Sequence, residues 1–179
     1  NSWQNTVGQA LIVREFLRMR EDGLSFDEMC SKIDGFKATS QIIFTISTLD
    51  YLKKGGRIGK MLTTVGDKLN IQPLLNLKKG DLSITSITRS RKKAKPVVIA
   101  NAKKFFENKN IDDYFITVGF GYDPVEAAEF RATVEAELGI TCVENLPGED
   151  FPATIGAVTA CHTGPFSLGI SFVQKYETI

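Results

Sequence analysis

The sequence has few of the residues that metal sites, disulfides and catalytic triads depend on. Its 179 residues include one histidine, His162, and three cysteines, Cys30, Cys142 and Cys161. The cysteines are odd in number, far apart and not in CxxC spacing, so they predict neither a disulfide framework nor a metal site, and a reducing, cytoplasmic setting fits them best. A Ser-His-Asp triad could use only His162, and no serine stands out as its nucleophile.

The chain also lacks a strong net charge and a long apolar run. Its 22 lysines and arginines oppose 21 acidic residues, so no global field favours nucleic acid as a partner. No apolar run reaches the roughly 18 residues that a membrane helix needs, and the N-terminus has no signal-peptide pattern, so we expect no stable membrane insertion. The 42% of hydrophobic residues suffice for one substantial core or two small lobes.

Motifs for nucleotide and metal chemistry are absent as well. The sequence has no GxxxxGK[ST] phosphate loop, no HExxH and no GxSxG nucleophile elbow. Gly119-Phe120-Gly121 follows an expected strand, but Tyr122-Asp123-Pro124 replaces the rest of a dinucleotide fingerprint. We therefore expect neither a metal centre nor a bound cofactor.

Residues 47–60 combine a short helix with a cationic glycine turn, Ser-Thr-Leu-Asp-Tyr-Leu-Lys-Lys-Gly-Gly-Arg-Ile-Gly-Lys. An apolar, β-branched run at 41–46 precedes them and predicts a buried strand. Gly55 and Gly56 end the helix and allow either a positive φ or a close approach to another segment. Arg57 then lies on an open turn, where its guanidinium can hold a carboxylate or a phosphate. A solvated helix end explains the same residues locally.

The remaining chain alternates expected helices and strands. Apolar residues at helical spacing predict a first helix over 6–20, and Ser25 with Glu28 three residues later predicts a capping box at the next helix. Asp123-Pro124 and Gly139 predict the start and the end of a later helix. The Lys-Lys-Gly-Asp turn at 78–81 lies between two β-rich runs and predicts a hairpin. A helix between two expected strands, at 114–120 and 140–143, predicts parallel pairing with a right-handed crossover. The expected helices cover 6–20, 26–36, 60–69, about 91–107 and 124–138, and the expected strands cover 41–46, 74–77, 83–88, 114–120, 140–143 and 168–173.

Two charged features are ambiguous. Arg89, Arg91 and Lys92 belong to the densest basic cluster, at a helix start where cations oppose the helix dipole, so an acidic partner could dock there. A solvated helix start is the simpler explanation. His162 precedes Thr163 in an expected turn, where a ring could be held by hydroxyls and directed at a ligand, although a lone histidine is more often structural.

Three segments together resemble a known family. These are the stretch 47–60, Leu-Asn-Ile-Gln-Pro-Leu-Leu at 69–75 and His-Thr-Gly-Pro at 162–165, and their order and spacing are similar to those of the DegV family of bacterial fatty-acid-binding proteins. The chain starts at Asn1 without a methionine and enters a helical pattern almost at once. We therefore expect residues 1–179 to be the C-terminal lobe, with segments that return to the first lobe, and the upstream lobe to be absent.

The resemblance implies a two-lobed, layered α/β fold that buries one long-chain fatty acid in an apolar tunnel. It also implies a non-catalytic carrier that delivers this acid to a fatty acid kinase. Residues 1–6 align with a family segment rich in small hydroxyls. The implied ligands of the fatty acid carboxylate are Ser2, Thr6, Arg57, His162 and Thr163.

Two other functions compete with the carrier. The Lys-Lys-Gly-Gly-Arg turn could bind phosphate in an enzyme that handles phosphate or nucleotides, although the absent nucleotide loop weighs against it. Alternatively, the basic cluster at 89–93 could make the chain an interaction module for an acidic partner such as the kinase.

Overall fold

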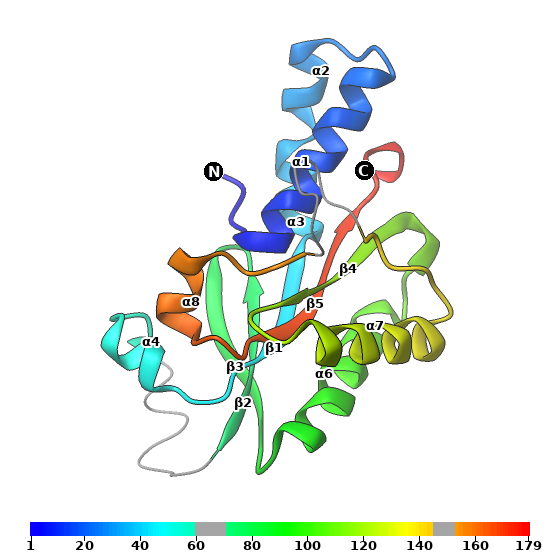
Figure 1. Ribbon diagram of the computed structural model, residues 1–179. Coiled ribbons are helices and arrows are strands. Elements are labelled where there is room, and N and C mark those ends of the chain that lie inside the picture. Colours follow the sequence, from blue (N-terminus) through cyan, green and yellow to red (C-terminus); the bar gives the residue numbers. More distant parts are fainter. Residues whose placement is uncertain (60–70, 145–152) are drawn as a thin grey trace.

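The computed structural model describes residues 1–59, 71–144 and 153–179 and shows a mixed α/β fold built on one antiparallel sheet (Figure 1). The expected α/β class is therefore confirmed. Every pair of neighbouring strands in the sheet is antiparallel, and the strand order is β3-β2-β1-β5-β4. The strands are β1 (Gln41–Thr45), β2 (Gln72–Lys78), β3 (Asp81–Thr88), β4 (Tyr114–Phe120) and β5 (Leu168–Gln174).

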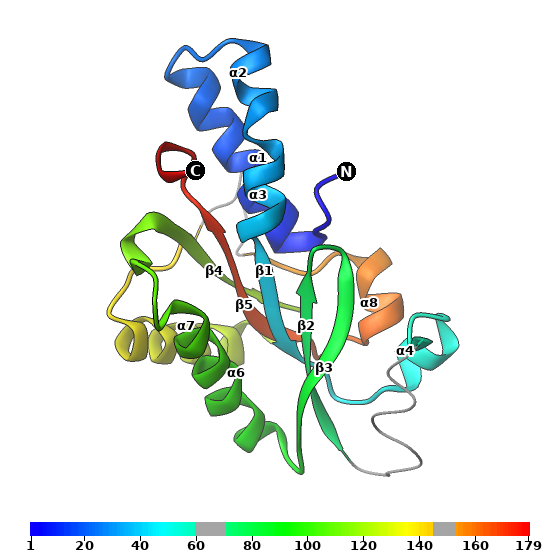
Figure 2. The same ribbon diagram turned by 180° about the vertical axis from the view of Figure 1, so that it is seen from behind.

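Helices cover both faces of the sheet (Figures 1 and 2). Two long helices pack on one face, where Ile170 and Phe172 of β5 share a core with Val98 and Phe130. The opposite face packs against the first helix, since Val173 shares a core with Leu11. The α-helices are α1 (Thr6–Glu21), α2 (Phe26–Ser31), α3 (Ile33–Thr39), α4 (Asp50–Lys54), α6 (Arg91–Phe106), α7 (Pro124–Leu138) and α8 (Ala157–Thr163), with short 3-10 turns η2 (Ile111–Asp113) and η3 (Tyr176–Thr178).

Sequence signals at the helix ends are borne out. Ser25 and Glu28 form a capping box at α2, and the Asp123 carboxylate accepts bonds from the first backbone N–H groups of α7. Gly139 ends α7 in the left-handed conformation. The expected helix over 26–36 is instead two helices, because the chain leaves helical hydrogen bonding at Lys32, whose ammonium donates to the Ile179 carbonyl. The expected helix over 60–69 lies outside the described residues.

The predicted parallel unit around α7 is wrong. Residues 140–143 do not form a strand, because the Cys142 N–H is bonded to the Glu135 carboxylate at 2.8 Å instead of to a neighbouring strand. Of these residues, Val143 is bonded to β4: its N–H donates to the Ile116 carbonyl, and its carbonyl accepts from Thr117 Oγ1, each at 2.7 Å. Among the described residues, an isolated parallel bridge joins Phe120 to Thr154. The next described strand of the sheet after α7 is β5, which is antiparallel to β4.

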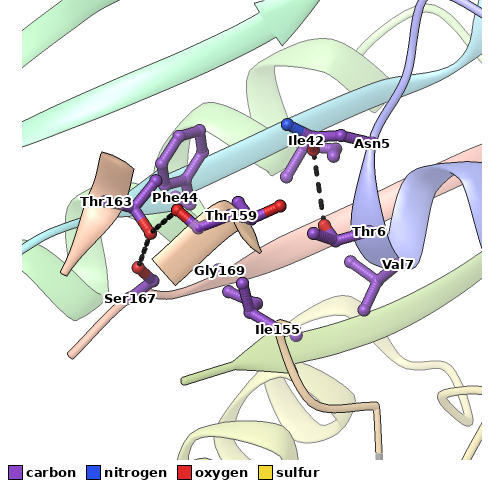
Figure 3. A pocket seen from close by; sticks show the side chains of 11 residues that line it. Asn5, Thr6, Val7, Ile42, Phe44, Ile155, Thr159, Thr163, Ser167 and Gly169 are labelled. Carbon is purple, nitrogen blue, oxygen red and sulfur yellow. Dashed lines mark hydrogen bonds between the residues drawn. The ribbon is translucent and has the colours of Figure 1, made fainter. Parts of the chain in front are cut away.

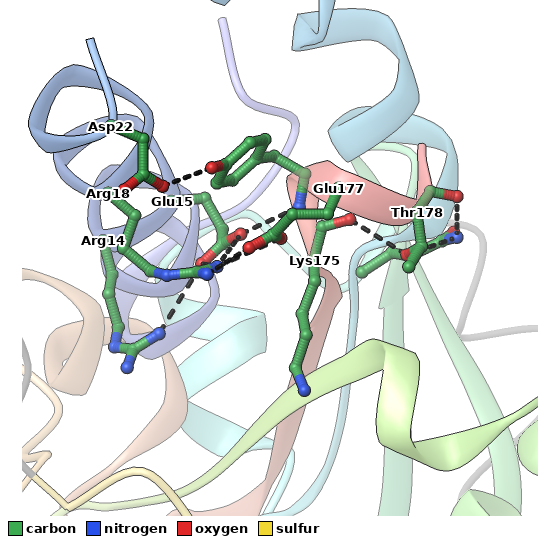
Figure 4. A network of polar contacts seen from close by, with 9 residues as sticks. Arg14, Glu15, Arg18, Asp22, Lys175, Glu177 and Thr178 are labelled. Atoms are coloured by element: carbon green, nitrogen blue, oxygen red, sulfur yellow. Dashed lines mark hydrogen bonds and ion pairs between the residues drawn. The ribbon is translucent and has the colours of Figure 1, made fainter. Parts of the chain in front are cut away.

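A buried carboxylate joins α1 to the end of the chain (Figure 4). Glu15 is fully buried and accepts bonds from the Tyr176 N–H at 2.9 Å and from the Arg18 guanidinium at 3.0 Å. Arg18 also pairs with Glu177, and Arg14 lies 3.5 Å from the Glu15 carboxylate. Burial raises the pKa of Glu15 and outweighs the opposing bonds from Tyr176 and Arg18. The C-terminal segment is thus held by a charged group that would be costly to leave unpaired.

A second carboxylate links α6 to α7. Glu126 accepts from Arg91 Nε at 2.7 Å and lies 2.9 Å from the Lys95 ammonium. Burial alone would raise the pKa of Glu126, but bonds and charges from Arg91 and Lys95 outweigh it, so the pKa is lowered. The carboxylate of α7 therefore offsets the cations that crowd the start of α6.

We expect Glu126→Gln to cost about 1 to 2 kcal/mol at pH 7, because the pair is only partly buried. A lowered folded-state pKa stabilises the protein above the unfolded pKa of about 4.3, and this contribution disappears as pH falls through the folded-state value. Urea unfolding of the wild-type protein and of Glu126→Gln at pH 7 and at pH 3 measures this contribution to the free energy of unfolding. An equal difference at both pH values would contradict the assignment, and Glu129→Gln, an exposed change on the same helix, is the control.

Candidate ligand-binding site

Two glycines that face each other across strands open a pocket in the sheet. Gly119 of β4 and Gly169 of β5 are direct partners in register, and Phe44 of β1 lies opposite Gly169. On the same face, the row continues through larger apolar residues of β2 and β3. Because the last two positions of the row have no side chain, a gap of about 360 Å³, counting its open mouth, lies between this face, the start of α1 and α8 (Figure 3).

The pocket lining mixes apolar and polar side chains. Thr159, Thr163 and Ser167 form a hydroxyl-rich part at the α8 side, whereas Asn5 and Thr6 lie at the opposite side, at the start of α1 (Figure 3). Apolar side chains from α1, from β1 and from the segment before α8 form the rest of the wall. The apolar lining residues are Val7, Ile42, Phe44 and Ile155, and the polar ones are Asn5, Thr6, Thr159, Thr163 and Ser167. Such an amphiphilic lining suits a ligand with a polar head and an apolar body.

The buried hydroxyls at the α8 side are already bonded to one another. Ser167 Oγ donates to Thr163 Oγ1 at 2.8 Å, and Thr163 Oγ1 donates to the Thr159 carbonyl at 3.2 Å. The second of these bonds is long, so the Thr163 proton can be redirected to a carboxylate at little cost. Thr163 can therefore serve as a donor only by giving up its backbone partner.

Thr6 lines the pocket from a strained backbone position. Its φ is +40°, a region that β-branched residues rarely adopt, and its hydroxyl donates to Asn5 Oδ1 at 3.4 Å (Figure 3). Strained backbone persists where surrounding structure holds it, and it gathers at ligand sites. The strain fixes the Thr6 hydroxyl at the pocket wall with only a weak bond to replace.

His162 lies beside this pocket and does not line it. The expected turn at His162 is wrong, because His162 and Thr163 end helix α8 and the turn begins at Gly164, with φ +78°. A Cβ placed on Gly55 would lie 2.1 Å from His162 Nδ1, so α4 packs on the histidine through a glycine. His162 Nδ1 is buried and has no hydrogen-bond partner among the described residues.

The other two predicted ligands lie apart from the pocket lining. Arg57 is exposed, and its guanidinium donates to the Gly55 carbonyl at 2.7 Å, beside the His162 contact. Ser2 Oγ donates to the Gln4 carbonyl at 3.2 Å. Thr6 and Thr163 thus both line the pocket, at opposite sides of it, and Arg57 lies near His162 at Gly55, while Ser2 is at neither place. The five-residue carboxylate site stays a prediction.

Comparison with known proteins decides the family. Residues 1–175 match the family model described as "Uncharacterised protein, DegV family". The chain belongs to the DegV family. A DegV domain-containing protein from Clostridium perfringens is 32% identical over 169 residues, and one from Clostridium acetobutylicum is 30% identical over 171 residues. The matches cover 93% and 95% of this chain but only 55% and 58% of those relatives, so the chain spans little more than half of their length.

Solved DegV structures share the fold. A stearic-acid-binding protein from Eubacterium ventriosum is 43% identical with a TM-score of 0.92, and the match covers 99% of this chain and 59% of that protein. A DegV family protein from Thermus thermophilus, described as binding fatty acid, is 25% identical with a TM-score of 0.82, covering 97% and 59%. The expected family is therefore confirmed, whereas the assignment of residues 1–179 to the C-terminal lobe, with the upstream lobe missing, stays a prediction.

Several DegV pocket residues were not predicted from the sequence. Thr159 precedes Thr163 by four residues, which places both on one face of α8. Ser167 lies just before β5, where it looks like an ordinary turn residue. Gly119 and Gly169 each interrupt a strand pattern, and such a glycine signals close approach or missing side-chain volume.

The predicted docking cations of this DegV chain differ in their surroundings. Arg91 is engaged inside the molecule with Glu126 and with the Phe166 carbonyl, at 2.6 Å from Nη1. Arg89 and Lys92 are exposed. Docking by this cluster stays a prediction, in which Arg91 is mainly a structural residue.

The described part of the chain was also compared with the requirements of a metal site and of a membrane-spanning helix. Residues 1–59, 71–144 and 153–179 contain no group of acidic, histidine and cysteine side chains arranged to hold a metal ion. Within the same ranges, every helix is too short or too polar to cross a membrane.

Proposed function

We propose that this DegV protein binds a long-chain fatty acid, with its carboxylate at the hydroxyl-rich part of the pocket and its acyl chain along the apolar part. The amphiphilic pocket over Gly119 and Gly169 is the observation that carries the proposal. Support comes from the stearic-acid-binding protein of Eubacterium ventriosum, which is 43% identical. The match covers 59% of that protein, so the proposal concerns only the part of the fatty acid site that this chain lines.

The physical chemistry of a fatty acid matches the two halves of the pocket. Each buried methylene contributes about 0.8 kcal/mol, so apolar walls such as Phe44 and Ile42 suffice for the acyl chain. A carboxylate taken out of water needs several donors to offset its desolvation. Thr6 and Thr163 can each offer one proton after releasing a long hydrogen bond, and Thr159 adds a third hydroxyl.

The predicted ligands outside the pocket lining complete the proposed head-group site. Arg57 carries the positive charge and would approach by exchanging its bond to the Gly55 carbonyl for one to the carboxylate. His162 is adjacent through Gly55, and Ser2 would have to turn from the Gln4 backbone. In this proposal Arg57, His162 and Ser2 would lie at the mouth of the pocket, where the head group meets the solvent or another protein.

The same proposal makes the protein a carrier and not a catalyst. A fatty acid whose carboxylate lies at a mouth can be presented to a fatty acid kinase, which would supply the nucleotide chemistry. On this view the protein needs no cofactor, and the fatty acid is its ligand.

Denaturing extraction and mass spectrometry of the purified full-length protein tests the carrier function. We expect one fatty acid per protein molecule. Thr159→Val keeps the shape of the side chain and removes a hydroxyl, and we expect it to reduce retention of the acid about tenfold, equivalent to about 1.4 kcal/mol. Thr133→Val, an exposed threonine of α7, should change nothing. Well-folded protein without any fatty acid would refute the function.

The phosphate-handling alternative makes a different prediction. An enzyme that uses the Lys-Lys-Gly-Gly-Arg turn would hydrolyse ATP or acyl phosphate, and Arg57→Ala would abolish the reaction. Because no GxxxxGK[ST] loop accompanies this turn in the sequence, we expect no turnover by the full-length protein alone. Arg57-dependent turnover would favour the enzyme over the carrier.

A further inference from the structure

Helix α6 concentrates the positive charge of the chain. Residues 89–109 carry eight lysines and arginines and one carboxylate, a net charge of +7, whereas the whole chain has +1. Arg91 and Lys95 pair with Glu126, and Lys103 pairs with Glu137, so α7 neutralises part of this charge. The cations without an ion pair among the described residues include Arg89, Lys92, Lys93 and Lys104, and all four are exposed.

A groove with an apolar floor runs beside these cations, between α6 and α7. Exposed Pro96 and Ala100 continue the line of Lys92 along α6 at one-turn intervals, and Ile99 and Phe130 lie beneath them. Counting the solvent at its open side, the groove encloses about 920 Å³. Helices α6 and α7 lie side by side in both views, on the sheet face opposite the pocket (Figures 1 and 2).

The dimensions and charge of the groove specify its occupant. From Lys92 to Lys103 the line spans eleven residues, or roughly 16 Å, which is about three turns of a helix. A trough between two helices with small residues at its centre accepts the apolar face of a third helix. Lys92, which is exposed and has no ion pair among the described residues, lines the edge of the groove and favours an acidic side chain on the flank of that helix, and Lys93 adds charge next to it in the chain.

We propose that the α6–α7 groove is a docking site for an acidic amphipathic helix of a partner protein. The partner would lay leucine-like side chains over Pro96 and Ala100 and place carboxylates near Lys92 and Lys93. Binding there leaves the mouth of the pocket free, because the two sites lie on opposite faces of the sheet. This inference goes beyond fatty acid binding and does not depend on it.

Isothermal titration of the full-length protein with a synthetic 18-residue peptide tests the site. The peptide is a helix with leucines on one face and glutamates on the flanks, and its control has the same composition in a scrambled order. We expect the amphipathic peptide to bind at least tenfold more tightly than the control. A double Lys92→Glu, Lys93→Glu variant should lose at least tenfold in affinity.

A pair of tryptophan variants separates the groove from simple charge attraction. Thr133 lines the groove, so Thr133→Trp should fill it and weaken binding at least fivefold. Ala132→Trp, at an exposed neighbour outside the groove, should leave affinity unchanged. Equal binding of both peptides, or no effect of Thr133→Trp, would overturn the proposal and leave a solvated basic face.

Vesicles of phosphatidylglycerol provide the last arm. If the wild-type protein sediments with these vesicles and binds neither peptide, the basic face recognises an anionic lipid surface and the proposal is wrong. Mass spectrometry of the extracted fatty acid in the same samples tests fatty acid binding separately. The docking proposal can therefore fail while the carrier proposal holds, and the reverse is also possible.

Discussion

Gly169→Val is expected to prevent folding, whereas Gly119→Val is expected to give a folded protein whose pocket is filled. A Cβ on Gly169 would lie 2.4 Å from the Ile43 carbonyl oxygen and 2.6 Å from Phe44 Cα, which are backbone atoms of the adjacent strand. These atoms cannot retreat without breaking the β1–β5 ladder. We expect a loss of more than about 4 kcal/mol, which exceeds most single substitutions.

Gly119 has flexible neighbours instead. A Cβ there would meet the two methyl groups of Val7 at 2.8 and 3.0 Å, and the side chain of α1 can shift. We expect about 1 to 3 kcal/mol of destabilisation from overpacking and a loss of co-purified fatty acid of at least tenfold. Circular dichroism on heating and mass spectrometry of extracts measure both effects. A stable Gly169→Val protein, or Gly119→Val with a full complement of lipid, would show that this description of the pocket floor is incorrect.

Glu15→Ala is expected to destabilise the protein by about 3 to 5 kcal/mol. The change removes the partner of Arg18 and Arg14 and the acceptor of the Tyr176 N–H, and breaking one side of a buried ion pair leaves the other charge uncompensated. Glu177→Gln is the matched control, because it removes a half-exposed partner of the same Arg18 and should cost less than about 1 kcal/mol. Urea unfolding midpoints compare the three proteins.

Glu15→Gln refines this test through pH. A folded-state pKa raised above the unfolded value stabilises the protein below the unfolded pKa, and the contribution is lost as pH rises through the folded-state value. Glutamine keeps the shape of the protonated acid and does not titrate. The advantage of wild-type protein over Glu15→Gln should therefore be larger at pH 4 than at pH 7. The reverse order would mean that ion pairing at Glu15 outweighs burial.

The elements with local signals were predictable from the sequence. The apolar spacing of α1, the Asp123–Pro124 start of α7 and the hairpin of β2 and β3 depend on neighbouring residues, and all three are confirmed. The glycines after α4 fulfil both expected uses, since Gly56 has a positive φ and Gly55 allows the close approach of His162. Local propensity needs no knowledge of the fold.

The pairing of distant strands was not predictable in the same way. The parallel unit failed because it required the segment after α7 to join the sheet, and a side-chain bond from Glu135 to Cys142 diverts it. The pocket depends on Gly119 and Gly169 being opposite each other, which is a matter of register between strands almost fifty residues apart. The resemblance of residues 162–165 to DegV proteins pointed to the end of α8, where Thr163 lines the pocket, but it gave neither Thr159 nor the glycine floor.

The position of β5 in the sheet affects how the chain folds during synthesis. This last strand of the chain lies between β1 and β4 in the sheet. While the ribosome is still making it, β1 to β3 form an unfinished sheet with an open edge, and β4 has no partner in the sheet. The nascent chain therefore exposes pairing surfaces until β5 emerges, and fast closure or chaperone binding limits its aggregation.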